Sequence, residues 1–145
     1  MKYVEALNKY EGKGNSLFIA GGITNCPDWQ AELVESLKNE DITILNPRRK
    51  NFPIDDPNAS EEQIIWEFEH LKKADAVSFW FPKETLCPIT LYELGKISMT
   101  SKKLFVGVHP EYKRKRDIEI QTKLLRPEIK IVYSIKDLAG QIISK

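Results

Sequence analysis

The sequence LFIAGG fills residues 17–22, where a short apolar run ends in two glycines. Comparable apolar runs lie at 42–45, 76–81, 104–108 and 129–133, each bounded by Gly, Pro or charge, and they predict strands, several of them buried on both faces. Helical patterns separate these runs. They lie near residues 28–39, 61–74, 91–101, 117–125 and 135–144.

This alternation predicts an α/β protein with a parallel sheet and helices on both faces, because right-handed crossovers leave few other topologies. We expect a three-layer, flavodoxin-like (Rossmann-like) fold with five strands in the order 2-1-3-4-5. In such sheets a ligand lies beyond the carboxyl ends of the strands, near the switch point between strands 1 and 3. The loops after those two strands are therefore the expected positions of functional residues.

Length and charge set limits on the class of protein. With 145 residues, we expect a single domain, 1–145, with its core at about 16–134. The content of 41% hydrophobic and 30% charged residues is that of a folded globular protein. Because 22 Lys and Arg face 21 Asp and Glu, the net charge of +1 gives no reason to expect a nucleic acid polymer or an anionic membrane as partner.

The chain shows neither a leader-like start nor an apolar stretch near the roughly 20 residues that span a bilayer, so we expect a cytoplasmic protein. Its two cysteines, Cys26 and Cys87, stand outside any CxxC or Cys/His cluster. We therefore expect no disulfide and no metal.

The loop after the first strand begins with Gly21, Gly22 and Ile23. Paired glycines permit a turn with positive φ and close approach of a ligand, and the following helix offers free N–H groups, so the loop could seat a phosphate or a sugar. A tight structural turn explains such a pair about equally well. Trp29 could form a wall of a base pocket, although packing is the more common role at the start of a helix.

Glu93 has two interpretations. Thr90 and Glu93 have capping-box spacing, in which the glutamate returns to the N–H of the cap. Alternatively, a carboxylate in the first turn of a helix at the carboxyl edge of the sheet is favoured in its ionised form and could act as a nucleophile.

Glu67 belongs to the predicted second helix, whose expected cap is Ser60 with Gln63. The expected buried stripe consists of Ile64, Ile65, Phe68 and Leu71. Glu67 then lies on the flank of this stripe, either paired with a nearby lysine or placed there for function. Trp66 and His70 fall on the other side, where an exposed aromatic pair would suggest a subunit contact.

Polar residues at other strand ends are further candidates for contacting a base, sugar or phosphate. They are Asn25 after the first strand, and Asn46 and Arg48 after the second. The pair Arg48-Arg49 suits recognition of a phosphate or carboxylate, although arginines in loops are usually solvated.

Several short motifs together resemble the nucleoside 2-deoxyribosyltransferase-like family. They are FIAGGI at 18–23, DWQ at 28–30, LNPRR at 45–49, WE at 66–67, ADAV at 74–77 and YELG at 92–95. The likeness is greatest to the branch with the Asn-Pro-Arg-Arg element. It implies a flavodoxin-like subunit, active as a homo-oligomer (dimer or higher), that cleaves the N-glycosidic bond of a deoxynucleoside or deoxynucleotide without a cofactor.

The resemblance also implies roles for individual residues. Glu93 matches the family's nucleophile, Glu67 matches an acidic residue that touches the sugar and assists proton transfer, and the turn at Gly22 matches the sugar and phosphate loop. Two positions depart from the pattern: Phe18 stands where many relatives have a tyrosine that orients the nucleophile, and Cys87 stands where they have an aspartate that contacts the base.

The resemblance leads us to expect transfer of deoxyribose from one base to another through a glutamate nucleophile. Two alternatives stay open. One is hydrolysis of a deoxynucleoside 5′-monophosphate, which relatives in another branch carry out, and the other is a non-catalytic nucleotide-sensing module, which the departures at Phe18 and Cys87 would suit.

Overall fold

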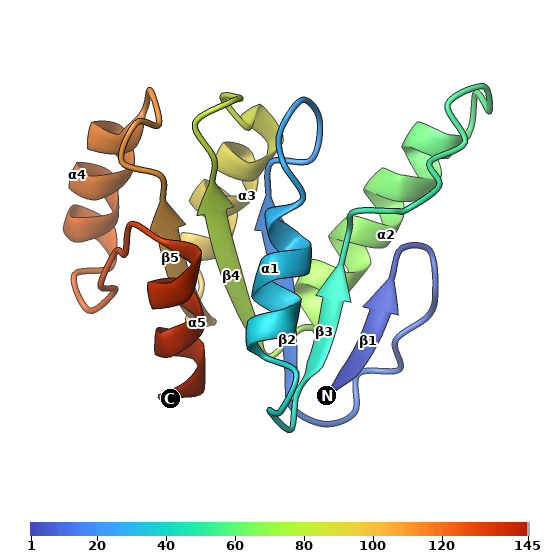
Figure 1. Ribbon diagram of the computed structural model, residues 1–145, viewed down its shortest axis with the longest axis horizontal. Helices are drawn as coiled ribbons and strands as arrows, with labels where there is room; N and C mark the ends of the chain where they lie inside the picture. Colours follow the sequence, from blue (N-terminus) through green and yellow to red (C-terminus); the bar gives the residue numbers. More distant parts are fainter. Residues whose placement is uncertain (145) are drawn as a thin grey trace.

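The structure, a computed structural model, describes residues 1–144. Its elements, in chain order, are β1 (Lys2–Glu5), β2 (Ser16–Gly21), α1 (Trp29–Ser36), β3 (Thr43–Asn46), α2 (Ala59–Lys73), β4 (Ala76–Phe81), α3 (Pro88–Ser98), β5 (Lys103–Val108), α4 (Lys115–Leu125) and α5 (Ile135–Ile143). Figure 1 shows α1 and α5 on one face of the sheet and α2, α3 and α4 on the other. None of the helices within residues 1–144 is long and apolar enough to cross a membrane.

The sheet is parallel throughout, with the strand order β1-β3-β2-β4-β5. The first four predicted strands are β2, β3, β4 and β5, and their predicted relative order is confirmed. The three-layer α/β architecture is also as predicted. The differences lie at the two edges of the sheet.

One edge holds a strand that the pattern did not predict. β1 pairs with β3 in the register Tyr3 opposite Ile44. Its sequence, KYVE, is exposed over its first half and only partly buried after it, as suits an edge strand. A strand with so few apolar residues gives neither the alternation nor the continuous run from which strands are predicted.

At the opposite edge, the strand predicted at 129–133 is reduced to a single parallel bridge between Val132 and Gly107. Val132 donates to the Val106 carbonyl (3.1 Å) and accepts from the N–H of Val108 (2.9 Å). The segment therefore lies where the fifth strand was expected. It pairs no further because α5 begins almost at once, with Ser134 as its N-cap.

Alternating side chains of the central strands divide the core between the two faces. On β2, Phe18 and Ala20 pack toward α2 and α3, whereas Leu17 and Ile19 pack toward α1 and α5. All four are at most 1% exposed. The strands are therefore covered on both sides, which explains their near-continuous apolar sequences.

The predicted orientation of α2 is wrong. Trp66 and His70 are buried at 5% and 2% exposure, while Ile64, Ile65 and Phe68 are 50–62% exposed; of the predicted stripe, only Leu71 is buried. The N-terminal segment causes this reversal. The Trp66 indole donates to the Asn8 carbonyl (2.8 Å) and His70 Nε2 accepts from the Tyr10 N–H (3.3 Å), so this segment covers the aromatic side of the helix.

Both predicted capping boxes are also wrong. α2 has Asn58 at its N-cap, without a side-chain hydrogen bond, and Gln63 points elsewhere. α3 begins at Pro88, after Cys87 in the left-handed region at φ 50°. Proline at the first helical position is favoured because its missing N–H is not needed there. Thr90 is therefore inside the helix, and Glu93 is in its second turn.

Candidate active site

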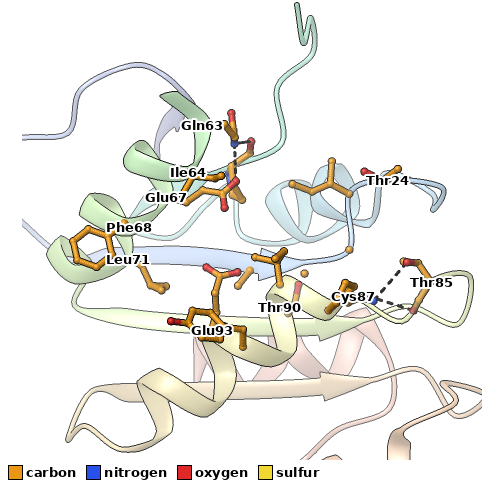
Figure 2. A pocket seen from close by; sticks show the side chains of 18 of the residues that line it. Thr24, Gln63, Ile64, Glu67, Phe68, Leu71, Thr85, Cys87, Thr90 and Glu93 are labelled. Carbon is orange, nitrogen blue, oxygen red and sulfur yellow. Dashed lines mark hydrogen bonds between the residues drawn. The ribbon is translucent and has the colours of Figure 1, made fainter. Parts of the chain in front are cut away.

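A cavity of about 980 Å³ opens at the carboxyl ends of β2 and β4, between α2 and α3. Figure 2 shows its lining from close by. The end of β2 and the loop after it contribute residues 20–24, and the loop after β3 contributes Pro47, Arg49 and Phe52. The remaining walls come from α2, from α3 and from the loop before α3. The cavity is therefore at the position that the fold predicts for a ligand.

Glu67 and Glu93 enter this cavity from different helices. Their carboxyl groups point toward one another, Glu67 from α2 and Glu93 from α3 (Figure 2). Glu93 is 8% exposed, and Glu67 is partly buried. Two acidic residues that are 26 positions apart in the sequence thus line the same cavity.

The surroundings of the two carboxyls favour their protonated forms. Burial, and then the charge of Glu67, raise the pKa of Glu93 to about 8, while Lys96 acts in the opposite direction. Burial also raises the pKa of Glu67, against a hydrogen bond from Gln63. Because the pKa of Glu93 is about 8 and two like charges in one cavity oppose each other, at least one of the two carboxyls is protonated near neutral pH.

This finding corrects the expected electrostatics of Glu93. A first-turn position would have placed its carboxylate at the positive end of the helix dipole, which favours ionisation. In the structure, desolvation dominates instead and the pKa is raised. Glu93 lies beyond the first turn, where the effect of the dipole has largely fallen off.

The glycine pair is needed for close packing. A Cβ on Gly22 would lie 2.8 Å from the Pro82 ring and 3.0 Å from Cys87 Sγ. The Gly22 carbonyl accepts from the Trp29 indole (2.8 Å) and from the Gln30 amide (3.1 Å). Neither Gly21 nor Gly22 has a positive φ, contrary to expectation; in this loop Asn25 has one, at 57°.

Of the predicted binding residues, Gly21, Gly22 and Ile23 line the cavity, together with Glu67 and Glu93. Four others lie outside its lining: Asn25, Trp29, Asn46 and Arg48.

Two of these four are occupied with structural contacts. Asn46 donates to the Tyr3 hydroxyl (2.9 Å) and accepts from the Arg48 N–H (2.9 Å). The Arg48 guanidinium donates to the Pro27 carbonyl and to Gln30 Oε1, both at 3.0 Å. These bonds join the loop after β3 to β1 and to the loop after β2.

Sequence reasoning missed several lining residues, above all Arg49 and Gln63. Arg49 Nη1 and Gln63 Oε1 are buried without a hydrogen-bond partner in the part of the chain that the structure describes. The Arg48-Arg49 pair was a signal for the first, although nothing in it shows which arginine faces the cavity. Gln63 gave no such signal because its spacing from Ser60 suggested a cap.

The two departures from the family pattern differ in their surroundings. Phe18 is in the core, with its ring centroid 6.1 Å from that of Trp66, and it is absent from the cavity lining. Cys87 lines the cavity, and burial raises the pKa of its thiol to about 12. A neutral thiol thus occupies the place that an aspartate takes in many relatives.

Comparison with known proteins agrees with this architecture. The sequence model of a family described as "Nucleoside 2-deoxyribosyltransferase like" matches residues 14–112, from just before β2 into the loop after β5. This match includes both glutamates and the loops after β2 and β3. A search of curated proteins finds no match to this sequence. Since the match covers more than half of the chain, the protein belongs to the nucleoside 2-deoxyribosyltransferase-like family.

Proposed function

We propose that this protein cleaves the N-glycosidic bond of 2-deoxyribonucleosides and transfers the deoxyribose to a second base. Glu93 is the nucleophile and Glu67 the proton-transfer group. The observation that carries the proposal is the pair of carboxyls that face each other across one cavity from two different helices. Retaining glycosidases use two carboxyls in this way, one to attack the anomeric carbon and one to manage the proton.

The proposed reaction has two steps. In the first, a Glu93 oxygen bonds to C1′ while the C1′–N bond breaks, its electron pair goes to the leaving base, and Glu67 gives that base a proton. In the second, a nitrogen of the acceptor base attacks C1′, its proton passes to Glu67, and the Glu93 carboxylate leaves. The missing 2′-hydroxyl favours this route because that group would otherwise withdraw electrons from an oxocarbenium-like transition state.

The resting charge of the pair suits this sequence. Attack needs Glu93 ionised and departure of the base needs one proton, so the pair must hold a single proton. Since the pKa of Glu93 is about 8, the unliganded pair carries that proton at neutral pH. Ligand binding must then shift it from Glu93 toward Glu67 or the base, and the ammonium of Lys96 favours this shift by stabilising an ionised Glu93.

Hydrolysis of a deoxynucleoside 5′-monophosphate is the second candidate. Arg49 and Lys96 bring two positive charges to the lining, against at most about one negative charge on the two glutamates, because Glu93 is mostly protonated near neutral pH. This balance favours an anionic ligand. In this reaction water replaces the acceptor base in the second step. A sensor that binds the same ligands without turnover is the alternative outside enzymes.

One assay separates these functions. The protein is incubated with deoxynucleosides and deoxynucleoside monophosphates, with and without an acceptor base, and free and exchanged bases are measured by chromatography. Exchange supports transfer, release without exchange supports hydrolysis, and tight binding without release supports the sensor.

The residue test is Glu93→Gln, which keeps the shape of the side chain and removes the nucleophile. Catalysis through a covalent intermediate predicts a loss of at least about 10³-fold in kcat. Glu67→Gln should lower kcat by about 10²–10⁴-fold. Glu69→Gln, an exposed position on the same helix, is the matched control and should retain activity. Release of base by Glu93→Gln at the wild-type rate would refute the proposed mechanism.

A further inference from the structure

Gln63 has a fixed amide orientation next to one of the two carboxyls. Its Nε2 donates to the Pro47 carbonyl (2.7 Å) and to Glu67 Oε1 (2.8 Å), as Figure 2 shows for Glu67. Both amide hydrogens are therefore used, each on an acceptor. The flipped amide would place its oxygen against two other oxygens, so the hydrogen-bond network settles the orientation.

The contact with Gln63 acts on both the position and the charge of Glu67. The Pro47 carbonyl belongs to the loop after β3, so Gln63 ties Glu67 to a second element besides its own helix. The donated hydrogen bond lowers the pKa of Glu67 against the raising effect of burial. The hydrogen bond from Gln63 thus favours the ionised form of Glu67.

The other end of the amide is left without a partner. Gln63 Oε1 is buried and accepts no hydrogen bond from the described residues, and Arg49 Nη1 is buried and donates none. Both residues line the cavity, and Pro47, which holds Gln63, is only two positions before Arg49. The described lining of the cavity therefore has one open acceptor and one open donor, an arrangement that is unfavourable unless a ligand satisfies it.

These two open groups select a class of ligand chemistry. A phosphate dianion could accept from Arg49, but it has no hydrogen to donate to Gln63 Oε1. The edge of a heterocyclic base carries donors next to acceptors and satisfies both. The aromatic ring of Phe52 and the side chain of Ile64 also line this cavity, and the Arg49 guanidinium carbon is 5.3 Å from the centre of the Phe52 ring. Such surfaces suit a flat ring.

We propose that Gln63 is a positioning residue that links recognition of the base to the placement of Glu67. Its amide nitrogen holds Glu67, and its amide oxygen, together with Arg49 Nη1, receives a donor–acceptor edge of the base. This proposal rests on the proposed function, because it takes Glu67 as the proton-transfer group. A base bound to these two groups then fixes the same amide that orients the proton donor.

The first test is independent of activity. The carboxyl of Glu67 is titrated by NMR on the full chain labelled at the glutamate side chains, with assignment through Glu67→Gln. Gln63→Met has nearly the volume of Gln63 but no amide, so it should raise the pKa of Glu67. Gln121→Met, at an exposed position of α4, is the control and should leave that pKa unchanged. An unchanged pKa in Gln63→Met would overturn the positioning role.

The second test uses kinetics on a deoxynucleoside that the wild type cleaves. Gln63→Met should lower kcat by about 10²-fold, the effect of a slightly misplaced catalytic group, and should shift the pH profile. Arg49→Met removes the guanidinium and leaves the hydrogen bond between Gln63 and Glu67 in place, so it should lower kcat/KM by about tenfold or more through KM and leave the pKa of Glu67 unchanged. Lys50→Met, its exposed neighbour, is the matched control.

A third variant tests the same contact if Gln63→Met fails to fold. Gln63→Glu keeps an acceptor oxygen but cannot donate, so it should raise the pKa of Glu67 further than Gln63→Met does. Wild-type kinetics in the Gln63 variants, with Glu93→Gln inactive, would refute this inference and leave the proposed function standing. A wild type that releases no base would refute the proposed function, and the NMR titration would still decide the positioning role.

Discussion

Glu93 shows at the scale of one residue how a functional position conflicts with stability. Its pKa is raised from 4.5 to about 8 by burial and by Glu67, so the folded state binds a proton that the unfolded state releases. Stability is therefore highest below about pH 4.5 with respect to this group, declines as the pH rises toward 8, and levels off above that. Raised pKa values of this kind are common at functional sites, where burial and neighbouring charges act on the reacting groups.

This sign gives a stability prediction for Glu93→Gln. The glutamine never ionises. The free energy of unfolding of the variant should therefore exceed that of the wild type by roughly 2–5 kcal/mol at pH 9 and should nearly equal it at pH 5. Urea unfolding at the two pH values measures the difference. A gain of the same size at both pH values would mean that the difference in stability between wild type and variant comes from packing and not from ionisation.

Residues whose roles depend on local chain geometry could be predicted in part. Glu93 could be predicted from its place at the carboxyl edge of the sheet and from the resemblance that YELG carries. Its predicted position in the helix is wrong by one turn, because α3 begins at Pro88 and not after Thr90. Arg48 and Arg49 illustrate a limit of another kind. Adjacent residues in an irregular loop point in unrelated directions, and only tertiary contacts determine that Arg48 bonds to Pro27 and Gln30 while Arg49 lines the cavity.

At the scale of elements, the central strands were predictable and the edges were not. Strands covered on both faces, such as β2 and β4, need continuous apolar sequences, which leave a clear pattern. β1 has one neighbour and partial exposure, so its composition is hardly constrained. The buried side of α2 could not be predicted from its own sequence either. Both sides of this helix carry large apolar residues, and the segment that covers Trp66 and His70 is almost 60 residues away in sequence.

The attachment of this N-terminal segment should depend on pH. His70 Nδ1 lies 2.8 Å from the Trp66 carbonyl and so carries the hydrogen, while Nε2 accepts from the Tyr10 N–H. Burial, and then Lys73, lower the pKa of His70, against the Trp66 carbonyl and Glu69. The unfolded state therefore gains this proton first, and the contact loses stability as the pH falls below about 6.5, the ordinary value.

Hydrogen exchange measures this effect. As the pH falls from 7.5 to 5, the protection of the Tyr10 amide and of β1 should decrease relative to that of β4, after correction for the intrinsic exchange rate. His70→Gln can accept a hydrogen bond but does not titrate in this range, so it should remove the pH dependence. Equal loss of protection in β1 and β4 would indicate global unfolding and contradict a local role of His70.

At the scale of the whole molecule, the surface next to the cavity is markedly apolar. The reversed facing of α2 leaves Ile64, Ile65 and Phe68 exposed, and on α3 Ile89 and Tyr92 are exposed at 62% and 68%. All except Ile65 also line the cavity. Apolar residues grouped in this way commonly form protein contacts. The family resemblance suggested a homo-oligomer, but the expected contact through Trp66 and His70 is wrong, because both are buried.

We therefore predict that copies of the chain associate through the exposed face of α2 and α3. Light scattering coupled to size exclusion should give a mass at a multiple of 16.8 kDa. Ile65→Lys places a charge on this face without touching the cavity lining, so it should shift the mass toward that of one chain. Ile120→Lys on α4 is matched in exposure, 45% against 50% for Ile65, and should leave the assembly intact. A wild-type mass of 16.8 kDa over the concentration range of the assay would contradict the prediction, and equal dissociation by both variants would place the contact elsewhere.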